Sequence, residues 1–148
     1  MSSIGVQTNP PRFSAYVASK AALDAFTRVV SSETIGDEVT FTTIHMPLVR
    51  TAMIAPTRLY DSFPTISPDE AADLICEAIR SRPKQINTRL GTFGEVAYAL
   101  APKAVDRLLH MAYKVFPESS AAKGDKESQD RASGEATALA HLMRGVHW

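Results

Sequence analysis

The sequence has few of the features that mark several common protein classes. Its single cysteine, Cys76, cannot form an internal disulfide, a zinc ribbon or a CxxC redox pair. The 16 lysines and arginines balance the 16 aspartates and glutamates, whereas a nucleic-acid-binding protein usually has a basic excess. No run of about 18 apolar residues occurs, so no transmembrane segment is predicted. Residues 1–11 lack the basic start and apolar stretch of a secretory signal, which predicts a cytoplasmic protein.

The composition that is present fits one soluble domain. Of the 148 residues, 45% are hydrophobic and 22% are charged, which excludes a wholly disordered chain and allows one modest core. Cys76 is expected to be a small, buried, apolar residue in a helix. The four histidines share no metal-ligand spacing, so no metal site is predicted.

The first half of the chain has the pattern of a helix followed by a strand. Residues 2–11 are rich in turn formers. Apolar residues recur at four-residue spacings within 14–33, which predicts a helix buried on more than one side: Val17, Ala21, Ala25 and Val29. Residues 39–46 are rich in β-branched side chains and end before Pro47, which predicts a strand. A helix followed closely by such a strand indicates an α/β fold.

The second half is predicted to alternate loop, helix and strand. Residues 48–66 contain two prolines and are predicted to form a long loop. In residues 67–70, Ser67 can cap a helix, Pro68 suits its first turn and Glu70 completes a capping box, so a helix should run from there to Pro83. Residues 84–89 are predicted to form a short strand and 91–116 two helices divided at Pro102. Residues 117–137 are predicted to be a flexible linker, and 138–148 a short terminal helix.

Tyr16 and Lys20 form the pair with the clearest chemical meaning. Residues four apart on a helix share a face. A free tyrosine has a pKa of about 10, and a neighbouring ammonium group favours the phenolate, so such a pair can exchange a proton with a substrate alcohol or carbonyl. Ser3, thirteen residues before Tyr16, could hydrogen-bond the same substrate oxygen. The spacing alone is a weak signal, because an ordinary amphipathic helix with an exposed lysine and a half-buried tyrosine would look the same.

The neighbouring residues add a resemblance. Ser2-Ser3-Ile4-Gly5, followed by the decapeptide SAYVASKAAL at 14–23, resembles the active-site stretch of the short-chain dehydrogenase/reductase family. The strand at 39–45 and the segment LVRTAM at 48–53 resemble the family's next strand and its cofactor-side loop. The family usually has Pro-Gly where this chain has Met46-Pro47. The resemblance is strong over residues 2–51, extends to Arg89 and is vague beyond it.

This resemblance implies roles for five residues. Ser3, Tyr16 and Lys20 match the family's catalytic residues: Ser3 would hold the substrate oxygen, Tyr16 would be the general acid or base, and Lys20 would assist Tyr16. Tyr16, Lys20, Val49 and Thr51 match its cofactor-binding positions, with Val49 and Thr51 beside the nicotinamide carboxamide. The implied reaction is hydride transfer between NAD(P)H and a carbonyl, and the choice between NADP and NAD stays open.

The family's glycine-rich phosphate-binding turn has no counterpart in the 148 residues. No G-x-x-x-G-x-G or G-x-G-x-x-G pattern occurs, although the pyrophosphate needs such a turn at a helix N-terminus. The expected fold is therefore α/β, the C-terminal half of a Rossmann-type doubly wound fold, helix-rich and with few strands. Residues 1–89 would be a partial catalytic segment and 90–116 a helical extension, and the isolated chain is expected to be inactive.

An apolar carbonyl or acyl substrate is suggested by a second, narrower resemblance. The segment MPLVRTAMIAPT at 46–57 and the ending LMRGVHW at 142–148 look similar to bacterial reductases linked to fatty acyl chains. Residues 53–57 would then act as a lid. A homo-oligomer is expected where the full fold is present. Two alternatives remain: a non-catalytic remnant or interaction protein, and a helical acyl-binding or membrane-surface module in residues 90–148.

Overall fold

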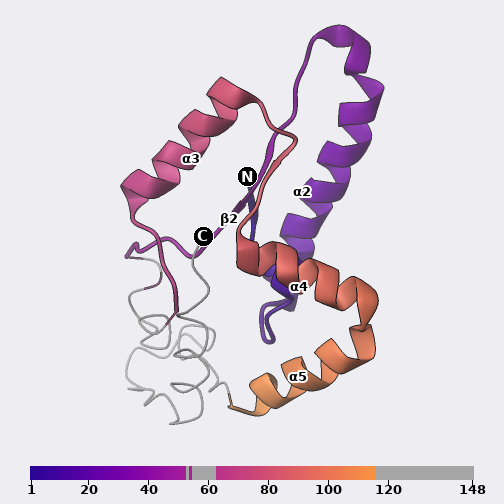
Figure 1. The fold of residues 1–148 in the computed structure, drawn as a ribbon, viewed down its shortest axis with the longest axis vertical. Helices are drawn as coiled ribbons and strands as arrows, with labels where there is room; N and C mark the ends of the chain where they lie inside the picture. The colour runs from indigo at the N-terminus through magenta and orange to yellow at the C-terminus, as the bar shows by residue number, and fades with distance from the viewer. Residues whose placement is uncertain (53, 55–62, 116–148) are drawn as a thin grey trace.

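A computed structural model describes residues 1–52, 54 and 63–115. These residues form three strands and five α-helices, with one 3-10 turn after the longest helix (Figure 1). In chain order the elements are β1 (Ser2–Ser3), α1 (Gly5–Thr8), α2 (Ser14–Glu33), η1 (Ile35–Asp37), β2 (Thr43–Met46), α3 (Pro68–Ser81), β3 (Gln85–Ile86), α4 (Arg89–Leu100) and α5 (Pro102–Val115). Helix α2 has the predicted bounds, and α4 and α5 divide at Pro102 as predicted.

The strands of the described residues form one parallel sheet in the order β1-β2-β3. Ser3 pairs with Met46, and Ile44 pairs with Ile86. Each connection between neighbouring parallel strands contains a helix, α2 in the first and α3 in the second, as parallel strands require. The expectation of a helix-rich α/β fold with few strands of Rossmann type is thus confirmed.

Helices α2 and α3 cover opposite faces of the sheet. Side chains alternate along a strand, so Ile44 and Met46 point to one face and His45 to the other. Ile44 and Met46 belong to a core cluster that includes Ala71 on α3, whereas His45 contacts Asp24 on α2. Figure 1 shows the same arrangement, with α3 and α2 on either side of β2. The sheet is therefore covered by a helix on each face, which is the doubly wound arrangement.

The apolar core lies between β2 and α3. Its buried members are Ile44, Met46, Ile66 and Ala71, and its half-buried members are Val49, Leu74, Ala78 and Ile86. Ile75 and Ile79 on α3 are exposed, and Cys76 between them is exposed as well, so its predicted burial is wrong.

Helix α2 is buried less than its sequence predicts. Asp24 is its one buried residue, and Leu23, Phe26 and Val29 are exposed. The reason is length: 20 helical residues extend about 30 Å, whereas strands of two to four residues extend only about 7–13 Å. Within the described residues the sheet covers only part of the helix, so the expectation of burial on more than one side is wrong there.

The structure differs from the predictions in two stretches of the first half of the chain. The stretch at 2–11, predicted as turns, contains β1 and the short helix α1. The strand predicted at 39–46 is shorter and begins at Thr43. The predicted linker at 117–137 and the terminal helix at 138–148 lie outside the described residues, as does most of the lid at 53–57. No helix among residues 1–52 and 63–115 is long and apolar enough to cross a membrane.

The capping box predicted at 67–70 is present at the start of α3. The Glu70 backbone N–H donates to Ser67 Oγ at 3.1 Å, and the Ser67 backbone N–H donates to Glu70 Oε2 at 2.7 Å. Two hydrogen bonds hold the pKa of Glu70 below its ordinary value. The larger effect comes from the bond with the Ser67 backbone, and the smaller from the bond with the Ser67 side chain. The helix start is therefore sensitive to acid.

We expect Glu70→Gln to reduce the acid sensitivity of the chain. A carboxyl whose pKa is lower in the folded state stabilises the fold above its unfolded-state pKa, and this stabilisation is lost as the pH falls through the folded-state pKa. Glutamine keeps the capping geometry but does not titrate. Loss of α3 helicity on acidification, followed by circular dichroism, should be smaller in Glu70→Gln than in the parent or in the exposed control Asp73→Asn. An acid response equal to the parent's would contradict the assignment.

Candidate active site

The predicted site residues gather at the carboxyl edge of the sheet. Ser3 ends β1 and pairs with Met46, which ends β2, so the segments that follow both strands leave the sheet at the same edge. In open parallel α/β sheets, ligands bind at this edge. Val49 and Thr51 follow β2 closely, and Thr88 follows β3. The topology therefore brings three separate parts of the sequence to one side of the molecule.

Ser3 is buried and held in a fixed orientation. The residue is 8% exposed, and its Oγ accepts a hydrogen bond from the Gly5 backbone N–H at 3.1 Å. A hydroxyl has one donor and two acceptor positions, so Ser3 can still donate its hydrogen to a second oxygen. A Cβ at Gly5 would lie 3.4 Å from Ser3 Oγ and 3.6 Å from Val17 Cγ2, so Gly5 is next to both the serine and the first turn of α2.

Tyr16 and Lys20 lie together on that first part of α2. The Lys20 Nζ is 6.0 Å from the centroid of the Tyr16 ring, within the range of a cation–π contact. Tyr16 is 47% exposed and Lys20 is half-buried, so an incoming molecule can reach the tyrosine hydroxyl. The chain thus presents an accessible phenol with a cation beside its ring.

Val49 lies in a short parallel bridge after β2. It forms a parallel bridge with Ile66, in which the Arg50 N–H donates to the Ile66 carbonyl and the Ile66 N–H donates to the Leu48 carbonyl. This pattern uses the groups on either side of Val49, and among the described residues nothing pairs with its own N–H and C=O. Thr51 is exposed, and its carbonyl accepts a hydrogen bond from the Ile54 N–H at 3.1 Å.

The five predicted residues are brought to one region but are not all in contact. Strand β1 packs against α2, and this packing places Ser3 near the Tyr16–Lys20 turn. No hydrogen bond joins Ser3 to Tyr16 in the part of the chain that the structure describes. Residues 1–52, 54 and 63–115 also contain no cluster of three or more histidine, cysteine or acidic side chains suited to a metal ion.

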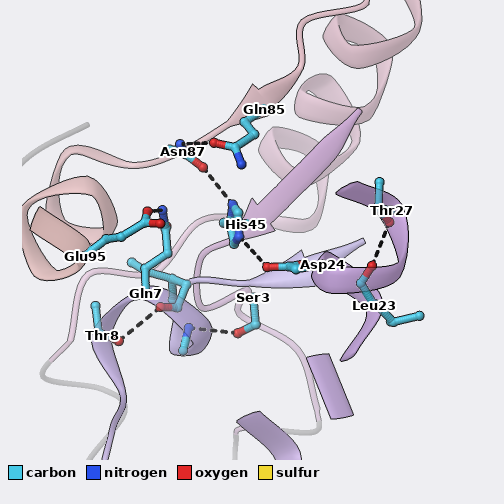
Figure 2. A network of polar contacts seen from close by, with 12 residues as sticks. Ser3, Gln7, Thr8, Leu23, Asp24, Thr27, His45, Gln85, Asn87 and Glu95 are labelled. Atoms are coloured by element: carbon cyan, nitrogen blue, oxygen red, sulfur yellow. Dashed lines mark hydrogen bonds and ion pairs between the residues drawn. The ribbon is translucent and has the colours of Figure 1, made fainter. Parts of the chain in front are cut away.

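A buried polar network centred on His45 was not predicted. The His45 Nε2 lies 2.8 Å from Asp24 Oδ2, and its Nδ1 lies 2.7 Å from Asn87 Oδ1 (Figure 2). The Asn87 Nδ2 donates to Gln85 Oε1 at 3.3 Å, which leaves Oδ1 to face the histidine. Both ring nitrogens therefore face oxygen atoms. The network joins α2, β2 and the segment after β3, three elements that carry or flank the predicted site.

Two residues of this network interrupt apolar patterns in the sequence. His45 is the one ionisable residue in the β-branched stretch at 39–46, and Asp24 lies among apolar residues on α2. A charged residue is rarely buried without a partner, so two such interruptions of apolar patterns could have been paired with each other. Their separation of 21 residues gives no periodic signal, and only the fold shows that they meet.

An open groove lies at the start of α4. It has a volume of about 460 Å³ and a mostly apolar lining, and it is lined by Asn87, Thr88, Arg89, Thr92, Phe93 and Val96. Its volume is within the range of small-molecule sites, about 300–1,000 Å³. Because it begins where β3 ends, it is on the same side of the sheet as Ser3 and Val49.

The fold and the site together define a class of protein. It is a parallel α/β protein with a serine, a tyrosine and a lysine close to the carboxyl edge of its sheet. The family model described as short chain dehydrogenase matches residues 1–60, which contain all five predicted site residues.

Relatives extend this similarity over the whole chain. A fatty acyl-CoA reductase of Acinetobacter baylyi is 51% identical over 148 residues, which are 100% of this chain and 49% of that protein. An uncharacterized oxidoreductase of Mycobacterium tuberculosis is 47% identical over 150 residues, covering 100% of this chain and 44% of the relative. A fatty acyl-CoA reductase of Mycobacterium tuberculosis is 40% identical over 99 residues, 67% of this chain and 34% of that protein. No solved structure matches significantly.

Residues 1–60 of the chain match the short chain dehydrogenase family, and the whole chain is similar to curated oxidoreductases. It spans about half the length of the curated relatives that match it throughout. The family resemblance predicted from residues 2–51 is thereby confirmed, and so is the likeness to a fatty acyl reductase.

Proposed function

We propose that the chain carries the proton-transfer half of an NAD(P)-dependent oxidoreductase that reduces a carbonyl on an acyl substrate. The observation that carries this proposal is the accessible Tyr16 hydroxyl beside Lys20, with the buried Ser3 close to the same turn. A tyrosine beside a cation can donate a proton to a carbonyl oxygen, and a second hydroxyl can hydrogen-bond the same oxygen.

In this proposal Tyr16 is the general acid. Its hydroxyl donates a proton to the carbonyl oxygen as that oxygen gains negative charge, and the Lys20 ammonium stabilises the phenolate that remains. Ser3 donates a hydrogen bond to the same oxygen, and the Gly5 N–H orients its Oγ for this purpose. Each group acts where charge develops in the transition state, which is where a fixed donor contributes most.

The nicotinamide end of a dinucleotide fits the residues present. The unpaired N–H and C=O of Val49 match the acceptor and donor of a carboxamide, and the exposed Thr51 lies two residues further on. Lys20 is close enough to Tyr16 to bond a ribose hydroxyl beside it. When bound, the cofactor supplies the hydride. NAD and NADP differ only at the adenosine ribose, far from the nicotinamide, so these residues accept either one.

An acyl substrate is supported by two independent observations. Two of the relatives are named fatty acyl-CoA reductase. The groove at the start of α4 presents Phe93 and Val96 to solvent on the same side of the sheet as Ser3. An apolar groove that opens near a proton donor could hold an alkyl chain while its carbonyl reaches Tyr16.

A hybrid enzyme tests the proposal directly. This chain would replace the matching segment of the Acinetobacter baylyi fatty acyl-CoA reductase. We expect the hybrid to oxidise NADPH or NADH in the presence of a long-chain acyl-CoA or the matching aldehyde, and to act more slowly on acetyl-CoA. Absorbance of the reduced nicotinamide measures the rate. A folded hybrid that oxidises neither cofactor with any of these substrates would refute the proposal.

A further inference from the structure

The surface formed by α4 and α5 exposes several large apolar side chains. Its large apolar side chains are strongly exposed: Leu100 is 81%, Leu108 61% and Met111 64% accessible. Leu108 and Met111 are three residues apart and lie on one face of α5. Isolated exposed leucines are ordinary, but a row of this kind on consecutive helices marks an interaction surface.

The polar face of α5 is basic. Lys103, Arg107 and Lys114 are all exposed on it, and Asp106 is the one carboxylate of that helix. The whole chain, in contrast, has equal numbers of basic and acidic residues. Positive charge is therefore concentrated on the helix that also exposes the apolar row.

Tyr113 adds an aromatic group of mixed character to this helix. Its ring stacks with His110 at a centroid distance of 6.4 Å, and the Arg12 guanidinium lies 4.5 Å from its centroid. Tyr113 is 46% exposed, and Arg12 brings a further cation from outside α5. Because Tyr113 is two residues after Met111, about 200° around the helix, it lies on the side of α5 away from the apolar row.

We propose that the α4–α5 surface, defined by Leu100, Leu108, Met111, Lys103, Arg107 and Lys114, docks on an anionic lipid bilayer. An amphipathic helix with lysine and arginine on its polar face lies in the plane of a bilayer, its apolar side chains reach the acyl boundary and its cations reach the headgroups. Charge complementarity favours this occupant over a second copy of the chain. In a two-fold dimer each patch faces its own counterpart, which would bring the basic side chains of both copies together.

Vesicle sedimentation of the full chain tests the proposal. We expect binding to vesicles of equal parts phosphatidylcholine and phosphatidylglycerol, weak binding to phosphatidylcholine alone, and release at high salt, which screens exposed charges. A cation near an anionic surface contributes roughly a factor of five in binding, so Lys103→Gln/Arg107→Gln/Lys114→Gln should bind about 100-fold more weakly. Leu108→Ser/Met111→Ser should bind at least about tenfold more weakly, because it removes buried methylene groups.

Matched controls distinguish binding through this surface from nonspecific binding of the chain to vesicles. Ile79→Ser/Arg80→Gln removes an exposed apolar side chain and a cation from α3 and should bind like the parent. Equal binding to neutral vesicles, an unchanged glutamine triple variant of parental helicity, or an equal loss in the α3 control would overturn the proposal. So would light scattering that shows a dimer in the parent and a monomer in the Leu108 variant. In the hybrid enzyme the triple variant should keep its rate on a soluble short-chain substrate, so failure of docking and failure of the proposed reaction are separable.

Discussion

We expect Tyr16→Phe to lower the turnover of the hybrid enzyme by about 10² to 10⁴. The substitution removes the one proton that the proposed mechanism transfers and keeps the ring beside Lys20. Steady-state oxidation of the reduced nicotinamide with a long-chain aldehyde measures the loss. Tyr98→Phe, which removes a hydroxyl of comparable exposure from α4, is the matched control and should be nearly silent. If Tyr16→Phe keeps more than about a tenth of the parental rate, Tyr16 is not the proton donor.

Two further variants assign the roles around Tyr16. Lys20→Ala should lower the rate by a similar factor and also weaken cofactor binding, because Lys20 is proposed to serve both groups. Ser3→Ala should affect cofactor binding less, since Ser3 is proposed to act on the substrate. It also leaves the buried Gly5 N–H without its acceptor, a cost of about 1–3 kcal/mol. The stability of this variant must therefore be measured beside its rate.

The second large effect concerns the free energy of unfolding. We expect Asp24→Ala to lower it by about 3 kcal/mol, because the substitution leaves His45 Nε2 buried without its oxygen partner. Urea denaturation of the hybrid, followed by circular dichroism, measures the change. Asp73→Ala, an exposed aspartate on α3, should change the stability by less than about 0.5 kcal/mol.

A double-mutant cycle separates the pair from its surroundings. Asp24→Ala and His45→Ala should each be destabilising, and the double variant should cost less than their sum, with a coupling of about 0.5–3 kcal/mol. Additive effects would show that the two side chains are stabilised independently. A loss below about 1 kcal/mol in Asp24→Ala would show that the contact contributes little.

The sequence predicted the elements that depend on neighbouring residues better than those that depend on contacts between distant parts of the chain. Helix α2 and the start of α3 follow from local signals, namely apolar periodicity and the capping residues at Ser67 and Glu70, and both were predicted well. The strand β1 was missed because two serines carry no strand signal, and it forms only by pairing with β2. The exposure of Cys76 and of the apolar side of α2 was also not predictable, since burial depends on what another part of the chain covers.

The candidate site shows the same contrast between residues that are close in the sequence and residues that are far apart in it. Tyr16 and Lys20 are one helical turn apart, so their proximity follows from spacing, and the structure agrees. The roles of Val49 and Thr51 came from the family resemblance alone, and the role of Ser3 came from its spacing to Tyr16 together with the resemblance. All three stay predictions until the variants are measured. The His45 network could not be derived, because it joins residues 24, 45 and 87 through tertiary contacts only.

The His45 network also restricts how β2 can align between its neighbours. A slip of one residue would turn the side chains of the strand to the other face. Ile44 or Met46 would then lie beside the Asp24 carboxylate, and the His45 imidazole would enter the apolar cluster under α3. Both changes bury a polar group without a hydrogen-bond partner, which is far more costly than misplacing a methyl group. A strand of four residues forms few backbone hydrogen bonds, so these bonds alone select one register only weakly. The buried polar contact of His45 therefore helps to fix the register of this short sheet.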